Sequence, residues 1–245
     1  MKQNNRSKFR PILGGHRGHL SHIRENTIPN FEEVKKLNLS YIEIDVQLTK
    51  DQRAVIYHDT ELSEKTDLSG MIREYTGQEL RESFEICTLE EAVSWCRENS
   101  IGMALEIKLH PRTMWQDREV LAKEICAIIG RYDFYGQCFV FGKDYGMLSM
   151  IKNMNSRVYI GLIVPFVPEN PVKLMEKMRA VVYLNYADQL PENLVKELQE
   201  AGYWVDGSVV NSKEELRLAQ ELGVDLIESD HPEYILELLG EKNES

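Results

Sequence analysis

The sequence lacks several features that would assign it to a specialised class of protein. No apolar run approaches the roughly 18–20 residues that a membrane span needs, and the best candidate, 161–167, is short and contains Pro165. No apolar segment follows the polar, basic residues 1–10, so we expect no signal peptide. The sequence therefore predicts a protein without a stable membrane anchor.

Cysteine and positive charge are also scarce. The cysteines Cys87, Cys96, Cys126 and Cys138 form no C-x-x-C pair, which favours buried thiols in a reducing, cytoplasmic compartment over disulfide bridges. Lysine and arginine number 29 against 40 aspartates and glutamates, a formal net charge of −11. Proteins that bind nucleic acid usually show the opposite balance or a basic stripe. We therefore expect no nucleic-acid partner, and the basic cluster within residues 2–10 is interpreted as a solubilising tail.

The composition that remains is ordinary for a globular protein, with 42% apolar and 28% charged residues in a chain of 245. Short β-rich runs alternate with longer helical patterns, which predicts eight strands and eight helices. Strands are expected at 11–15, 41–47 with a short extension at 54–57, 102–107, 137–141, 158–164, 181–185, 203–207 and 226–229. Helices are expected at 28–37, 88–99, 115–132, 144–153, 171–178, 191–201, 212–222 and 232–239.

This alternation indicates an α/β fold with a parallel sheet. Eight units in 245 residues match the usual size of a closed (β/α)₈ TIM barrel, and an open doubly wound sheet is the alternative. No linker divides the chain, so we expect a single TIM-barrel domain over 1–245, with an ordered core at about 11–240. Segment 59–86, which follows the second strand, lacks a clear unit and is expected to form a small cap insertion on the catalytic face.

Two histidines stand where strands of such a barrel would end, which is where its reactive groups belong. His16 and Arg17 lie in a glycine-rich turn after the first strand and offer a proton carrier and an anion clamp. An ordinary surface turn is the alternative. His58 ends the run 54–57, where a loop or packing role is the alternative.

Two strands carry charged residues at positions i and i+2, which face the same way. Glu43 and Asp45 repel each other unless a cation lies between them, although a solvated polar face is the alternative. Glu106 and Lys108 end the next barrel strand as an acid beside a base, or as a simple ion pair.

Taken together, these side chains fit cleavage of a phosphodiester by in-line displacement. Carboxylate oxygens suit one hard divalent cation, Mg²⁺ or Ca²⁺, better than zinc. The two imidazoles can exchange protons as acid and base. The cation, Arg17 and Lys108 could neutralise the phosphate.

The order and spacing of these blocks resemble the glycerophosphodiester phosphodiesterase family, in the form of a short, soluble bacterial-type member. The family's opening motif is His-Arg-Gly, five residues, then Pro-Glu-Asn-Thr. Its later blocks are Ile-Glu-x-Asp-Val, Thr-x-Asp, His-Asp, Thr-Leu-x-Glu-Ala, Glu-Ile-Lys and Gly-Val-Asp-x-Ile-x-Thr/Ser-Asp-x-Pro. The corresponding stretches here are 16–18, 24–27, 42–46, 49–51, 58–59, 88–92, 106–108 and 223–232.

The resemblance implies a TIM barrel that hydrolyses small glycerophosphodiesters, such as glycerophosphocholine or glycerophosphoethanolamine, to sn-glycerol 3-phosphate and an alcohol. It also implies the functional residues: Glu43, Asp45 and Glu106 as metal ligands, His16 and His58 as catalytic acid and base, and Arg17 and Lys108 as substrate-binding groups. The attacking group is water or the glycerol's own hydroxyl through a cyclic phosphate, and the resemblance favours the second.

Two departures from the family pattern stand out. Arg24 replaces the motif proline, which removes a backbone constraint but no catalytic group. Residues 208–211 read Ser-Val-Val-Asn where the family often has Trp-Thr-Val-Asn, which leaves the preferred head group open.

Other functions remain open at this point. They are a phosphodiesterase acting on lysophospholipids, another metal-dependent barrel hydrolase such as an amidohydrolase, and a non-catalytic binding module. The sequence does not fix the metal, the alcohol, which histidine is the base, the physiological role or the oligomeric state.

Overall fold

The computed structural model describes residues 10–20, 23–108 and 115–241. Its parallel strands follow one another around a ring, and β1 pairs with both β2 and β10, which closes the ring. The TIM barrel is therefore confirmed, and the open sheet is wrong. The barrel strands are β1 (Ile12–Gly15), β2 (Tyr41–Leu48), β5 (Gly102–Ile107), β6 (Cys138–Gly142), β7 (Tyr159–Ile163), β8 (Val182–Leu184), β9 (Trp204–Asp206) and β10 (Leu226–Ser229).

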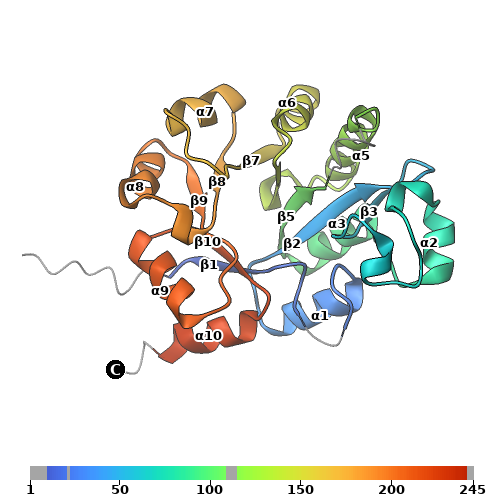
Figure 1. The fold of residues 1–245 in the computed structure, drawn as a ribbon, viewed down its shortest axis with the longest axis horizontal. Helices are drawn as coiled ribbons and strands as arrows, with labels where there is room; N and C mark the ends of the chain where they lie inside the picture. The colour runs from blue at the N-terminus through green and yellow to red at the C-terminus, as the bar shows by residue number, and fades with distance from the viewer. Residues whose placement is uncertain (1–9, 21–22, 109–114, 242–245) are drawn as a thin grey trace, which may run out of the picture.

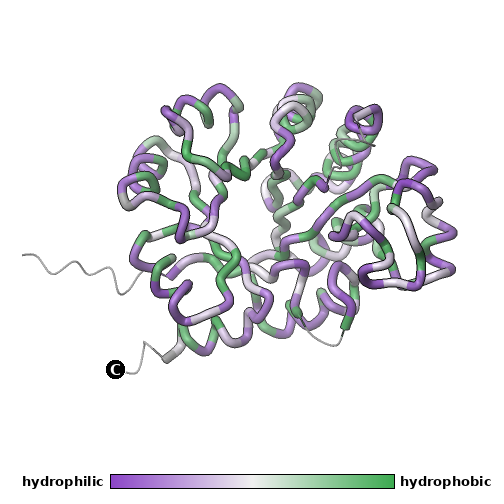
Figure 2. Tube along the Cα trace, in the orientation of Figure 1, coloured by the Kyte–Doolittle hydropathy of each residue, from purple (hydrophilic) through white to green (hydrophobic). Residues whose placement is uncertain are grey.

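Helices surround this ring (Figure 1). They are α1 (Ile28–Lys36), α3 (Leu89–Asn99), α5 (Arg118–Arg131), α6 (Tyr145–Met154), α7 (Pro171–Met178), α8 (Glu192–Glu200), α9 (Lys213–Leu222) and α10 (Pro232–Glu241). The large core lies between strands and helices, and the tube in Figure 2 accordingly shows hydrophobic and hydrophilic residues alternating along the helices. No helix in the described ranges is long and apolar enough to span a bilayer.

Local signals account for most of the element boundaries. Thr88 caps α3 and forms the expected capping box with Glu91, and Gly223 ends α9 in the left-handed conformation. The helix expected from residue 115 instead begins at Arg118, because residues 115–117 form a turn.

Segment 59–86 is more ordered than its sequence suggested. It contains two short 3-10 helices, η2 (Leu62–Glu64) and η3 (Ile72–Glu74), and the helix α2 (Gly77–Ser83). The strands β3 (Ala54–Ile56) and β4 (Cys87–Thr88) flank it and extend the sheet antiparallel from β2. Leu62, Ile72 and Leu80 build a separate apolar cluster here. The capping box of Thr76 and Glu79 was the overlooked signal for α2.

A candidate active site at the carboxyl ends of the strands

Three carboxylates meet inside the barrel. Glu43 and Asp45 lie on the inward face of β2, and Asp45 is level with Glu106 on the neighbouring β5. Each of the three offers an oxygen within 4.8 Å of the others. Glu43 is 1% exposed and Asp45 is 0% exposed. The predicted trio is therefore brought together by the parallel register of two strands.

The trio has the character of a cation site. Glu43 Oε1 and Asp45 Oδ1 are buried without a hydrogen-bond partner. Burial, followed by the charges of Asp45 and Glu106, raises the pKa of Glu43 well above its ordinary value. Clustered oxygen donors with unused lone pairs fit a hard divalent ion such as Mg²⁺ or Ca²⁺.

Lys108 is the nearest basic side chain to this cluster. Its Nζ lies 2.8 Å from Glu106 and 3.1 Å from Asp45. Burial would lower the pKa of Lys108, but the surrounding carboxylates raise it overall. Lys108 is therefore held as a cation at the edge of the cluster, in the ion pair with Glu106 that the sequence analysis gave as the alternative.

The β1–α1 loop orients two of these carboxylates. The backbone N–H of Arg17 donates to Glu43 at 2.9 Å, and the Asn26 amide donates to Asp45 at 2.9 Å. The Arg17 Nε lies 3.6 Å from Asp45. Asn26 belongs to the Glu-Asn-Thr stretch, although the sequence alone gave it no role.

Steric crowding and backbone conformation explain one glycine of β1 and one of the loop that follows it. A Cβ on Gly14 would lie 2.4 Å from the ring of Tyr41, whose hydroxyl crosses the barrel to the carbonyl of Ile227. Gly18 has a φ of +94°, a conformation that glycine adopts without steric cost. Gly14 of β1 thus leaves room for the Tyr41 ring, and Gly18 lets the chain turn directly after His16 and Arg17.

His16 is oriented by an aspartate that the sequence reasoning did not assign. Its Nδ1 lies 2.6 Å from Asp230, and its Nε2 lies 3.9 Å from Glu43. Asn211 in turn donates to Asp230 at 2.6 Å. The hydrogen bond from His16 is the main cause of the lowered pKa of Asp230. Both Asp230 and Asn211 occur in the sequence blocks quoted above, which was the available signal.

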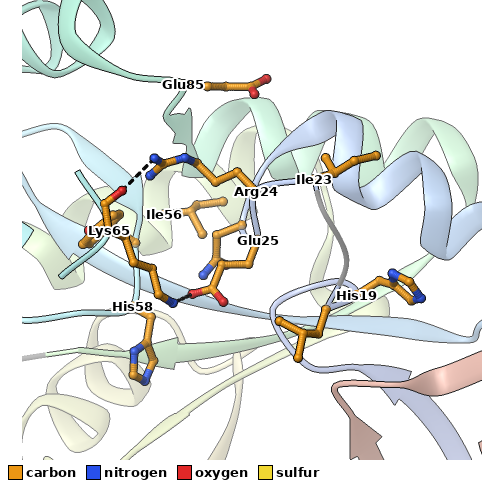
Figure 3. A pocket seen from close by; sticks show the side chains of 11 residues that line it. His19, Ile23, Arg24, Glu25, Ile56, His58, Lys65 and Glu85 are labelled. Atoms are coloured by element: carbon orange, nitrogen blue, oxygen red, sulfur yellow. Dashed lines mark hydrogen bonds and ion pairs between the residues drawn. The ribbon is translucent and has the colours of Figure 1, made fainter. Parts of the chain in front are cut away.

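His58 has the same kind of support. Its Nδ1 lies 2.6 Å from Asp59, and Lys65 of the inserted segment lies 3.4 Å from the same carboxylate. Burial alone would raise the pKa of Asp59, but the hydrogen bond from His58 and the charge of Lys65 lower it overall. His58 lines a cavity of about 420 Å³ between the β1–α1 loop and the inserted segment. Figure 3 shows the side chains that line this cavity, with Lys65 in contact with Glu25.

The predicted residues share one larger cavity of about 480 Å³ at the carboxyl ends of the strands. Six of the seven line it, and Asp45 lies directly beneath as the buried member of the trio. The same cavity is also lined by Asp206 of β9 and Glu228 of β10, which the sequence reasoning missed. The two-residue strand period places Glu228 on the same face as the apolar Leu226. It therefore gives no pair of charged residues like the one that singled out Glu43 and Asp45.

Comparison with known proteins decides the family. A statistical model of the Glycerophosphoryl diester phosphodiesterase family matches residues 16–234. This chain belongs to that family. The resemblance inferred from the sequence blocks is thereby confirmed, and with it the expectation that the chain is a phosphodiesterase.

Individual relatives match this chain over most of its length. The glycerophosphodiester phosphodiesterase of Caldanaerobacter subterraneus is 27% identical over 94% of this chain and 98% of its own. Human Lysophospholipase D GDPD1 is 22% identical over 98% of this chain and 89% of its own. The structure of an Oleispira antarctica phosphodiesterase in complex with the product sn-glycerol-3-phosphate is similar in fold, with a TM-score of 0.82, 23% identity, and coverage of 96% and 99%.

Proposed function

We propose that this family member hydrolyses small glycerophosphodiesters to sn-glycerol 3-phosphate and an alcohol, as one TIM-barrel domain that depends on a divalent cation. The observation that carries the proposal is one cavity in which a three-carboxylate cluster faces two histidines, each paired with an aspartate. This combination supplies the charge and the proton carriers that in-line cleavage of a phosphodiester requires.

The aspartates fix which imidazole nitrogen can act. Asp230 and Asp59 have lowered pKa values and therefore remain carboxylates, which only accept hydrogen bonds. The Nδ1 atoms of His16 and His58 must then carry the protons in these contacts. Each Nε2 is left to accept a proton from the attacking hydroxyl or to return one to the leaving oxygen.

The basic side chains handle the charge of the phosphate. Arg17 and Lys108 line the cavity beside the carboxylate cluster, where they can neutralise phosphate oxygens. Glu43, Asp45 and Glu106 would hold the cation, which when bound withdraws charge from a phosphate oxygen. Lys108 also contacts the cluster directly, so its positive charge can stabilise negative charge that develops on the phosphate.

Product identification tests this function. Glycerophosphocholine and glycerophosphoethanolamine are incubated with the protein and Mg²⁺ or Ca²⁺, and products are followed by phosphorus NMR. We expect one product peak, sn-glycerol 3-phosphate. Phosphocholine or phosphoethanolamine as the product would mean that the other ester bond is cut, and intact diester with every metal would contradict the proposal.

One observation favours a second candidate, a phosphodiesterase for lysophospholipids. Large apolar side chains are exposed in loops that follow barrel strands, where an acyl chain could pack: Leu20 at 51%, Trp115 at 69%, Phe166 at 86% and Tyr186 at 60%. A higher kcat/KM for lysophosphatidylcholine than for glycerophosphocholine would favour this candidate. The reverse order favours the small water-soluble substrate.

The described cysteines are all free thiols. A cytoplasmic location stays a prediction, which cell fractionation tests.

A further inference from the structure

The wall of the cavity formed by β9 and β10 holds two more buried acids. Asp206 is 0% exposed and Glu228 is 3% exposed, and both line the cavity. Asp206 Oδ2 and Glu228 Oε1 have no hydrogen-bond partner. Two buried carboxylate oxygens beside the cavity therefore make no hydrogen bond within the fold.

The charge of His16 partly opposes the raised pKa of Asp206, but no close ion pair compensates these acids in the described ranges. Neither has an ion pair with a basic side chain among residues 10–20, 23–108 and 115–241. Besides burial, the groups that act on Glu228 are carboxylates, Asp206 first. Buried carboxylates without compensation are costly to a fold, and clusters of that kind are typical of sites completed by a ligand.

Ser208 links the two acids. Its backbone N–H donates to Asp206 at 2.9 Å, its hydroxyl donates to the same oxygen, and the hydroxyl accepts from the Glu228 N–H at 2.7 Å. Ser208 stands where the family often has tryptophan. A tryptophan side chain has neither the hydroxyl nor the small size, so the linked acid pair depends on this departure.

The geometry disfavours a second metal ion at this wall. Within the described part of the chain, the one set of three potential ligands within 4.8 Å is Glu43, Asp45 and Glu106. In the register, Asp206 is level with Leu226, so Glu228 lies two residues further along the adjacent strand. The two free oxygens suit a larger cation that carries several hydrogen-bond donors.

We propose that Asp206 and Glu228 form a subsite for a primary ammonium group on the alcohol portion of the substrate, as in glycerophosphoethanolamine. The inference rests on the proposed function, because it assigns the second arm of the same diester. An ammonium group has three N–H donors, more than one for each free carboxylate oxygen. A quaternary ammonium has no N–H donor, and a neutral alcohol has no positive charge to compensate the carboxylates.

Charge complementarity supports this occupant. Five acids face or underlie the cavity, namely Glu43, Asp45, Glu106, Asp206 and Glu228, against the basic groups Arg17, Lys108 and Lys143. A divalent cation at the trio would offset part of this excess of acids. The phosphodiester then adds one negative charge, which a positively charged head group offsets.

The test compares two substrates in four proteins. The kcat/KM values for glycerophosphoethanolamine and for glycerophosphoglycerol, whose head group is neutral, are measured for wild type, Asp206→Asn, Glu228→Gln and the control Asp188→Asn. Asp188 is exposed on the same face but does not line this cavity. We expect the ratio of the two kcat/KM values to fall at least about tenfold in the first two variants, since each loses a buried charge partner, and to stay constant in the control.

Several results separate the subsite from its alternatives. An unchanged ratio in both folded variants, or an equal loss on both substrates, overturns the subsite. If wild type cleaves neither diester, the proposed function is wrong, and the subsite is judged by a second arm. In that arm, millimolar ethanolamine should raise the Tm of wild type but of neither variant, and no difference in Tm overturns it.

Discussion

At the scale of single residues, the carboxylates of the site contact histidines, amide groups and basic side chains. Asp230 and Asp59 contact the Nδ1 atoms of His16 and His58, respectively, at 2.6 Å. Asn26 and the Arg17 backbone orient the carboxylates beneath them. Asp59 is the chain neighbour of the histidine that it contacts, whereas Asp230 and Asn26 come from distant segments, and each partner is open to substitution.

The two histidines give the first prediction. His16→Ala or His58→Ala should lower kcat by roughly 10²–10⁴-fold, the usual contribution of general acid–base catalysis. Asp230→Asn should lower kcat less than His16→Ala, because the imidazole remains but loses its fixed tautomer. Steady-state kinetics on glycerophosphocholine measure all three, and activity within tenfold of wild type for either alanine variant removes that histidine from the mechanism.

Asp206 gives a prediction about pH and stability. Burial, only partly opposed by hydrogen bonds from Ser208 and by His16, raises the pKa of Asp206 from 3.8 to about 6. The folded state therefore binds this proton more tightly than the unfolded chain does, so the contribution to stability falls as pH rises from about 4 through 6.

Asp206→Asn should remove this loss of stability at higher pH, because asparagine does not titrate. In urea titrations with EDTA, the variant should match wild type near pH 4 and exceed it by roughly 3 kcal/mol at pH 7, at 1.36 kcal/mol per pKa unit. A difference in unfolding free energy that does not change with pH would mean that Asp206 does not titrate in this range.

At the scale of elements, the strand period was the most informative signal. It located Glu43 with Asp45 and Glu106 with Lys108, because alternate residues of a parallel strand share a face. The same rule left Asp206 and Glu228 unassigned, since each is the lone acid of its strand. The partners Asn26, Asn211 and Asp230 come together only through tertiary contacts, which one chain's local pattern does not encode.

The inserted segment gives an element-scale prediction. Leu80 of α2 is fully buried in a cluster separate from the main core, and Leu→Ala at such positions costs about 2–5 kcal/mol. Leu80→Ala should therefore weaken hydrogen-exchange protection within 59–86 while the barrel strands keep theirs. It should also raise KM, because Lys65 of this segment contacts Asp59 behind His58.

Leu216→Ala is the matched control, because Leu216 is equally enclosed but lies on α9, in the main core. Loss of protection spread over the whole barrel in Leu80→Ala would show that the segment is not an independent cluster. An unchanged KM would show that the inserted segment does not affect substrate binding at the site.

At the scale of the whole molecule, the barrel gathers acids from four strands into its interior, in a chain with a net charge of −11. A site for a phosphodiester anion inside such a negative field needs positive charge from beyond the chain's own lysines and arginines. We therefore propose that a divalent cation at Glu43, Asp45 and Glu106 makes the cleavage possible.

Restoration of activity by metal tests that claim most directly. The protein is stripped with EDTA, and the rate of glycerophosphoethanolamine cleavage is followed as Mg²⁺ or Ca²⁺ is titrated back into wild type and Asp45→Asn. We predict that stripping lowers the rate at least about 100-fold, and that one of the two ions restores wild type but not the variant. Full activity in EDTA, or equal restoration of the folded variant, would contradict the account.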